Sequence, residues 1–191
     1  MGFTREQLLS FADAVVPDLI GPNCRLLFAG INPGLWTAAT GAHFARPGNR
    51  FYPALYAAGI TDHPIDASAG MREQDHAALV RAGVGITNVA PRATAKASEL
   101  TAEELRAGGA ALRVRVETVR PRVLAVLGIT AYRTAFREPK ATVGRQPQTI
   151  GDTELWVLPN PSGLNAHESV DTLAAAYRWA ADAAGVPDLR A

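Results

Sequence analysis

Apolar residues along the chain form short uninterrupted runs that alternate with amphipathic stretches. The runs have strand length and cover residues 25–31 (RLLFAGI), 84–91 (VGITNVAP) and 121–128 (PRVLAVLG). Such runs are typical of strands that are buried on both faces in a parallel sheet. Helical patterns occur over residues 72–83, 101–118, 130–138 and 169–185. This alternation predicts a single α/β domain with three layers, α/β/α, around a mostly parallel central sheet.

The N-terminal part predicts a helix that packs on the rest of the domain. Thr4 and Gln7 form a capping box, and we expect the helix to end near Pro17. Its apolar side is made by Leu8, Leu9, Phe11, Ala12, Val15 and Val16. We therefore divide the single domain, 1–191, into an N-terminal helical extension, 1–22, and a core that carries the candidate site, 23–185.

Three other segments have distinctive local patterns. Thr101 and Glu104 form a second capping box and predict a helix to about Thr118, although two glycines weaken it and RVRVETV alternates like a strand. Residues 148–163 (QTIGDTELWVLPNPSG) predict a hairpin with a Gly-Asp turn. Residues 32–49 are irregular and rich in Gly, Pro, Ala and Thr, and precede a short helix. A loop of that length inside a compact domain is usually functional.

The composition indicates one soluble domain with a sizeable core. The chain has 191 residues, 48% of them hydrophobic, and a single cysteine, Cys24. One cysteine excludes an internal disulfide, a four-cysteine zinc site and a cysteine-ligated iron–sulfur cluster. The first residues do not resemble a signal peptide, and no apolar run reaches the roughly 18 residues of a membrane span. We expect a cytoplasmic monomer without membrane contact.

The net charge of +1 leaves the choice of partner open. Residues 112–145 nevertheless carry eight Arg and Lys side chains against two Glu, a local charge of +6. Such a cluster is either a solvated face or a surface for nucleic acid. The charge alone permits DNA as a partner without requiring it.

Candidate chemistry gathers where three predicted strands end. The segments GINPG (30–34), GITN (85–88) and LPNPSG (158–163) all follow or close apolar runs. Because ligands bind beyond the carboxyl ends of parallel strands, we expect these segments to converge at one edge of the sheet. In GINPG the glycines allow close approach, Pro33 stiffens the turn, and the Asn32 amide both donates and accepts. That combination suits a water molecule or the edge of a base.

The sequence lacks several common active-site motifs. GINPGLW has neither the Lys-Ser/Thr of a nucleoside-triphosphate loop nor the third Gly of a dinucleotide fingerprint. The sequence also has no zinc-deaminase motif and no Gly-x-Ser-x-Gly elbow. A nucleotide-binding enzyme with a small-molecule substrate is thus a remote alternative. Leu164 lies at the tip of the polar turn LPNPSGLNAH, where it either tucks into the core or acts as a wedge in a base stack.

Three ordered motifs, GINPGLW, FARPGNRF and WVLPNPSGL, resemble the mismatch-specific uracil and thymine DNA glycosylase family within the uracil-DNA glycosylase superfamily. The resemblance extends from about residue 25 to the last helix. It implies a monofunctional glycosylase that flips uracil, best from G·U mismatches, out of double-stranded DNA. The N-glycosidic bond is hydrolysed in base excision repair, with an abasic site as product and with neither metal nor organic cofactor.

The resemblance also implies roles for individual residues. Asn32 positions the attacking water, and Asn160 faces the pyrimidine O2 and steadies its developing charge. Phe44 stacks on the flipped base, although core packing is its alternative role. Gly30 and Ile31 lie with Phe44 against the base edge. The turn that contacts DNA consists of Ser162, Gly163, Leu164 and Asn165. Asn49 and Arg50 also match the family pattern and either brace the loop or touch DNA.

Two positions depart from the family pattern. Asn88 stands where a bacterial member has Lys, and an amide pairs with both N3–H and O4 of uracil. We expect Asn88 to strengthen uracil recognition and to relax the demand for a mismatch; its alternative role is to satisfy local backbone. Ala166 replaces a basic residue that helps to read the partner guanine. A broad uracil or deaminated-base glycosylase and a catalytically weak binder of abasic DNA therefore remain alternatives.

Overall fold

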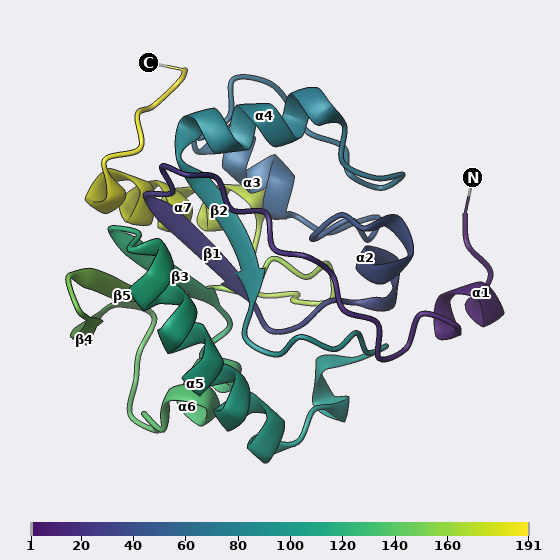
Figure 1. Ribbon diagram of the computed structural model, residues 1–191. Helices are drawn as coiled ribbons and strands as arrows, with labels where there is room; N and C mark the ends of the chain where they lie inside the picture. Colours follow the sequence, from purple (N-terminus) through teal and green to yellow (C-terminus); the bar gives the residue numbers. More distant parts are fainter. Residues whose placement is uncertain (1, 191) are drawn as a thin grey trace.

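The computed structural model describes residues 2–190 and has three layers, with helices on both faces of one five-stranded sheet (Figure 1). The sheet order is β2-β1-β3-β5-β4. Neighbouring strands in this order are parallel except for β5 and β4. The strands are β1 (Leu26–Gly30), β2 (Val84–Asn88), β3 (Val123–Leu127), β4 (Gly144–Ile150) and β5 (Thr153–Leu158). The predicted fold class is confirmed.

The apolar runs of the sequence become the central strands. Every residue of β1, β2 and β3 is buried, as the uninterrupted apolar pattern predicted. The antiparallel pair β4–β5 confirms the hairpin, and Gly151 and Asp152 form its turn. In the pair β1–β2, Gly30 lies opposite Asn88 at the carboxyl ends of both strands. This register brings GINPG and GITN together.

The helices divide between the two faces of the sheet. Helices α3, α4 and α7 lie on one face, and α5 and α6 on the other (Figure 1). The helices are α1 (Arg5–Leu9), α2 (Leu35–Thr40), α3 (Phe51–Ala57), α4 (Glu73–Ala82), α5 (Ala102–Val119), α6 (Ile129–Phe136) and α7 (Val170–Ala184), with a short 3₁₀ turn at Ala97–Glu99. None of the helices over residues 2–190 is long and apolar enough to cross a membrane.

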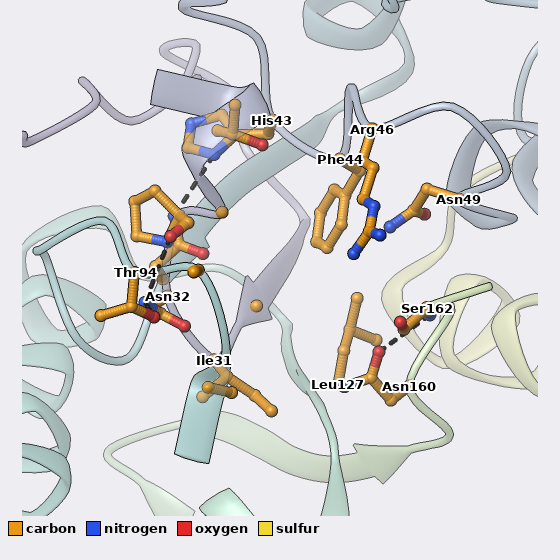
Figure 2. Close-up of a pocket in the computed structure, with 17 residues that line it drawn as sticks. Ile31, Asn32, His43, Phe44, Arg46, Asn49, Thr94, Leu127, Asn160 and Ser162 are labelled. Atoms are coloured by element: carbon orange, nitrogen blue, oxygen red, sulfur yellow. Dashed lines mark hydrogen bonds between the residues drawn. The ribbon is translucent and has the colours of Figure 1, made fainter. Parts of the chain in front are cut away.

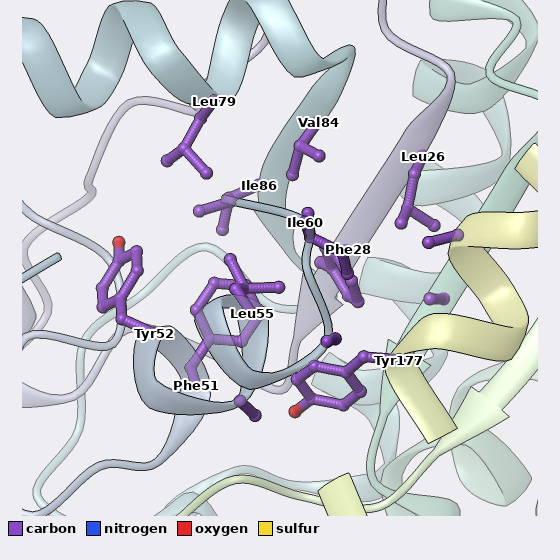
Figure 3. Close-up of a cluster of buried hydrophobic side chains, with 14 of the residues drawn as sticks. Leu26, Phe28, Phe51, Tyr52, Leu55, Ile60, Leu79, Val84, Ile86 and Tyr177 are labelled. Carbon is purple, nitrogen blue, oxygen red and sulfur yellow. The ribbon is translucent and has the colours of Figure 1, made fainter. Parts of the chain in front are cut away.

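Alternate residues of β1 supply two separate hydrophobic cores. Leu26 and Phe28 point to the face of α3, α4 and α7, where an aromatic cluster forms with Phe51 and Tyr177 (Figure 3). Leu27 and Ala29 point to the face of α5 and α6. A strand that contributes to both cores is fixed in position, and so is the loop that follows its last residue, Gly30.

The two glycines that weaken the predicted helix over 101–118 serve its packing. A Cβ atom on Gly108 would lie 2.3 Å from the carbonyl oxygen of Val89, and one on Gly109 would lie 2.4 Å from that of Ala135. Helix α5 therefore approaches the end of β2 and helix α6 more closely than any other residue type permits. The capping box of Thr101 with Glu104 is present as predicted.

Two predictions for local structure were wrong. The first helix keeps its capping box but ends at Leu9, and Asp13 has a left-handed φ of 64°. The reason is tertiary pairing: the backbone of Leu19 exchanges hydrogen bonds with Ile86, so the segment after the helix lines the free edge of β2 in extended form. The stretch 32–49 is also not wholly irregular, because it contains helix α2, which ends at Thr40 and is followed by Gly41 with φ 68°.

Candidate functional site

A cavity of about 170 Å³ opens at the carboxyl ends of the parallel strands. All three predicted segments meet there: Asn32 follows β1 and Asn160 follows β5 (Figure 2), and Asn88 closes β2. Pockets that hold whole small-molecule ligands have volumes of roughly 300–1,000 Å³. The smaller volume here suits a fragment of the size of one base rather than a whole nucleotide.

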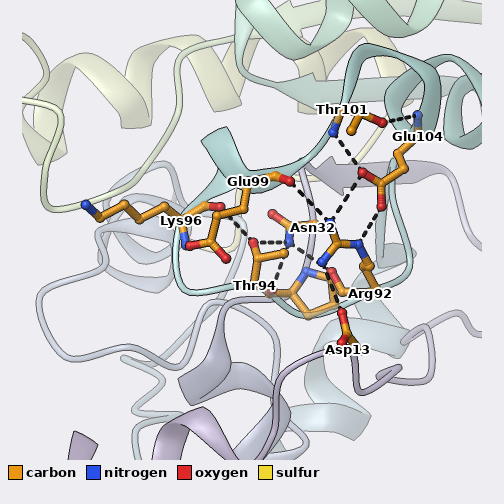
Figure 4. A network of polar contacts seen from close by, with 9 residues as sticks. Asp13, Asn32, Arg92, Thr94, Lys96, Glu99, Thr101 and Glu104 are labelled. Atoms are coloured by element: carbon orange, nitrogen blue, oxygen red, sulfur yellow. Dashed lines mark hydrogen bonds and ion pairs between the residues drawn. The ribbon is translucent and has the colours of Figure 1, made fainter.

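The side-chain amide of Asn32 is held in one orientation. Its Nδ2 atom donates to the carbonyl oxygens of Pro33 at 3.1 Å and Arg92 at 2.9 Å, and lies 2.8 Å from Oγ1 of Thr94 (Figure 4). The Thr94 hydroxyl itself donates to the carbonyl of Lys96, so it accepts from Asn32. These contacts use the donors of Asn32 and leave Oδ1 as its free group. An amide so fixed orients a water molecule by accepting a hydrogen bond from it.

The loop that holds Asn32 is itself anchored. The guanidinium of Arg92 binds Glu104 at the start of α5, Asp13 of the N-terminal segment at 3.0 Å, and the carbonyl of Glu99 at 3.2 Å (Figure 4). The hydrogen bond from Arg92 lowers the pKa of Glu104 to about 2. Two distant segments thus fix the Arg92 carbonyl that receives the Asn32 amide.

Asn160 has the opposite orientation. Its Oδ1 accepts from the backbone N–H of Ser162 at 2.9 Å. Because a backbone N–H only donates, the amide must turn its oxygen to Ser162 and its Nδ2 away from it. Nδ2 lies 3.7 Å from where a Cβ of Gly128, the residue after β3, would be, and Asn160 lines the cavity. Asn160 therefore offers N–H donors, the groups that stabilise a negatively charged oxygen.

Phe44 and Gly30 form one wall and the floor of the cavity. Phe44 has φ 55°, a left-handed conformation that costs a bulky residue of the order of 1–3 kcal/mol. Its ring lines the cavity (Figure 2). The ring also stacks on the buried Phe51 of the core, with centroids 4.0 Å apart. A Cβ on Gly30 would lie 3.2 Å from the Phe44 ring and 2.7 Å from Oδ1 of Asn88. Ile31 lines the same cavity.

Asn88 is buried at the cavity and contacts a histidine. Its Nδ2 lies 3.3 Å from Nδ1 of His43, whose Nε2 lies 2.9 Å from the carbonyl oxygen of Pro17. Burial lowers the pKa of His43, against the opposing effects of the Pro17 carbonyl and the charge of Asp18. Asn88 thus contacts a side chain rather than local backbone.

The turn at residues 162–165 presents a single apolar side chain to solvent. Leu164 is 76% exposed and does not tuck into the core. Gly163 packs against the neighbouring loop, because a Cβ there would lie 2.6 Å from the carbonyl oxygen of Gly48. The Asn165 side chain is taken up inside the turn, where it donates to the carbonyl of Asn160 and accepts from the backbone of His167.

Arg50 braces this turn from below. Its guanidinium donates to the carbonyls of Ser162 and Asn165, both at 2.6 Å, and to that of Glu168. The side chain of Asn49 accepts from the backbone N–H of Phe51 at the start of α3. Of the two roles open to Arg50, the contacts support bracing.

The sequence pattern did not single out three residues that line the cavity. Thr94 and His43 fix the amides of Asn32 and Asn88, and Arg46 is the single permanently charged side chain among the described lining residues. Arg46 stands in the quoted motif FARPGNRF, which was the available signal for it. His43 contacts Asn88 across 45 residues and Thr94 contacts Asn32 across 62 residues, and no local sequence pattern reveals contacts at such separations.

The basic side chains of the stretch 112–145 do not line the cavity, to which this stretch contributes Leu127. Arg115 pairs with Asp18 and Arg145 with Glu154, both at 2.8 Å, and Arg133 donates to the carbonyl of Ala141. These local pairs support a solvated face. Over residues 2–190, no three His, Cys, Asp or Glu side chains come together as a metal site.

Comparison with known proteins bears on the fold and on the family of the chain. A solution structure described as a "putative Uracil DNA glycosylase" from Methanosarcina acetivorans matches with a TM-score of 0.57 and 21% identity, covering 86% of this chain and 96% of that one. This likeness supports the fold. The family model of the uracil DNA glycosylase superfamily matches residues 17–182, and so includes Leu19, which pairs with Ile86 of β2, as well as all five strands. The chain therefore belongs to the uracil DNA glycosylase superfamily.

Proposed function

We propose that the protein is a monofunctional DNA glycosylase that flips uracil out of duplex DNA, best from G·U mismatches, and hydrolyses its N-glycosidic bond. The observation that carries this proposal is the Asn32 amide, whose Nδ2 shares its two N–H donors among three fixed acceptors and whose Oδ1 is left for water. The lining residues include no lysine that would form a Schiff base with the sugar. Water is therefore the nucleophile, and an abasic site is the product.

The chemistry follows from what the amides are able to do. An amide is not basic near neutral pH, so Asn32 orients water without taking its proton. The cavity lining also contains no carboxylate. These features favour a dissociative reaction, in which the bond to the base breaks first and gives an oxocarbenium-like sugar and a uracil anion. Asn160, with its donors free, stabilises the anion at O2.

DNA contacts would come from the cavity mouth and the exposed turn. Phe44 stacks on the extruded base, an interaction worth about 1–3 kcal/mol. Leu164 enters the base stack as a wedge, which its 76% exposure permits. Arg46 at the cavity mouth faces a phosphate of the flipped nucleotide. Ser162 and the neighbouring backbone amides hold a second phosphate.

A preference for guanine opposite the uracil would rest on the backbone of the turn. Arg50 already binds the carbonyls of Ser162 and Asn165, which leaves those of Gly163 and Leu164 to accept from the Watson–Crick edge of guanine. Ala166 offers no side chain for this purpose. We therefore expect a moderate preference for G·U over A·U.

The decisive experiment is single-turnover cleavage of a labelled duplex with one central G·U pair, followed by alkali to break abasic sites. Wild type should release uracil, and Asn32→Ala should lose at least about 100-fold in rate while it still binds an abasic duplex. The matched control is Asn23→Ala, an exposed asparagine at the other end of β1, which should keep its rate.

Other outcomes would favour other activities. If wild type binds abasic DNA but cuts nothing, the protein is a lesion binder with a glycosylase fold. A panel of A·U, single-stranded U, G·T and hypoxanthine substrates separates mismatch specificity from a broad deaminated-base activity. Unchanged uracil excision by Asn88→Ala would exclude a role for Asn88 in recognition.

A further inference from the structure

His43 is a buried polar side chain beside the cavity that has no part in the reaction described above. It is 4% exposed and lies on the loop between α2 and α3. Its two ring nitrogens contact two different partners, the carbonyl of Pro17 at 2.9 Å and Nδ2 of Asn88 at 3.3 Å. These contacts together determine how the Asn88 amide is oriented.

The carbonyl of Pro17 fixes the tautomer of the ring. A carbonyl oxygen only accepts hydrogen bonds, so Nε2 of His43 must carry a proton. Burial lowers the pKa of His43, so the ring is neutral and Nδ1 carries a lone pair. Nδ1 therefore accepts, and Asn88 must present its N–H to it. Because Nδ1 of His43 only accepts, the side of the Asn88 amide that faces His43 must be its nitrogen, and the oxygen lies on the opposite side.

The remaining polar group of Asn88 faces the cavity floor. Its Oδ1 would lie 2.7 Å from a Cβ on Gly30, so it occupies the space that this glycine leaves open. In the described part of the chain, no donor forms a hydrogen bond with this oxygen. The cavity thus contains an acceptor at a fixed place, with the amide nitrogen on the side of His43.

We propose that His43 is a positioning residue that locks the Asn88 amide and thereby makes the cavity select uracil over cytosine. The proposal rests on the proposed function and deepens it. Uracil has a donor at N3 and an acceptor at O4, whereas cytosine has an acceptor at N3 and a donor at N4. An amide in one orientation matches the first pattern, and the same amide rotated by 180° matches the second.

The test compares excision of uracil and cytosine by wild type and His43→Phe. Each target base stands opposite an abasic analogue, so that neither must leave a base pair. Wild type should prefer uracil strongly. In His43→Phe the amide is free to rotate, and the ratio of uracil to cytosine rates should fall at least about tenfold. His76→Phe, the same substitution at an exposed histidine of α4, should keep the wild-type ratio.

A double-mutant cycle separates positioning from a loss of general structure. If His43 acts through Asn88, then His43→Phe should not change the ratio further in an Asn88→Ala background. Nitrogen NMR of wild type provides a readout that needs no variant to fold. It should show a neutral His43 ring with the proton on Nε2 and a lone pair on Nδ1.

The outcomes are distinguishable. If wild type releases no uracil, the proposed function is wrong. If wild type releases uracil but the ratio is the same in His43→Phe, or if NMR shows the proton on Nδ1, the proposed function survives and the role of His43 is refuted.

Discussion

The floor of the cavity has room for glycine alone at position 30. In Gly30→Ala the added methyl would lie 2.7 Å from Oδ1 of Asn88 and 3.2 Å from Cζ of Phe44. Carbon–oxygen contacts are normally about 3.3–3.6 Å, so the Asn88 oxygen must retreat by roughly 0.6–0.9 Å. The bond from Asn88 to His43 is already 3.3 Å long and does not survive such a displacement.

The size of the effect follows from this loss. A well-oriented base contact is worth about 1–3 kcal/mol, which corresponds to roughly 5- to 150-fold in rate. We expect Gly30→Ala to lose uracil excision by that factor at saturating enzyme. The methyl also overpacks the floor and should lower the free energy of unfolding by about 1–3 kcal/mol.

The assay is single-turnover excision from a G·U duplex, with urea unfolding measured in parallel. Gly34→Ala serves for comparison, because a Cβ there meets no atom within 4 Å and its φ of −77° suits alanine. It should cost much less activity than Gly30→Ala. If Gly30→Ala were folded and within twofold of wild type, the close contact with Asn88 would have no functional meaning.

Two further predictions concern the turn and the pH dependence of stability. Arg50→Lys should weaken binding to an abasic duplex, because an ammonium cannot reach the three carbonyls that the guanidinium holds. Fluorescence anisotropy measures the affinity, and an unchanged value would contradict the role of Arg50 in bracing the turn at 162–165. Hydrogen bonds from His63 to Asp75 and Asp62 raise the pKa of His63. The protonated ring therefore stabilises the folded state, fully below about pH 6.5, and this contribution to the free energy of unfolding is lost as the pH rises through the raised pKa. His63→Asn should therefore flatten the decline of the unfolding free energy as the pH rises above about 6.5, and an unchanged slope would refute the assignment.

Local patterns in the sequence determined most of the fold. The buried strands, the capping boxes of α1 and α5, and the Gly-Asp hairpin turn depend on neighbours within a few residues. The convergence of GINPG, GITN and LPNPSG also followed from the sequence, because the carboxyl ends of parallel strands must meet at one edge. Asn32, Phe44 and Asn160 were accordingly identified, and all line the cavity.

The tertiary structure decided what these residues present to a ligand. The first helix stops at Leu9 because the following segment pairs with β2, a contact that no helical periodicity reveals. An asparagine in the sequence is equally a donor and an acceptor. Which group each amide turns to the cavity is determined by its tertiary contacts. The Thr94 hydroxyl orients Asn32, and the backbone N–H of Ser162 orients Asn160. The Pro17 carbonyl orients Asn88 through His43. Sequence thus fixed the residue types, and contacts between distant segments set their hydrogen-bonding direction.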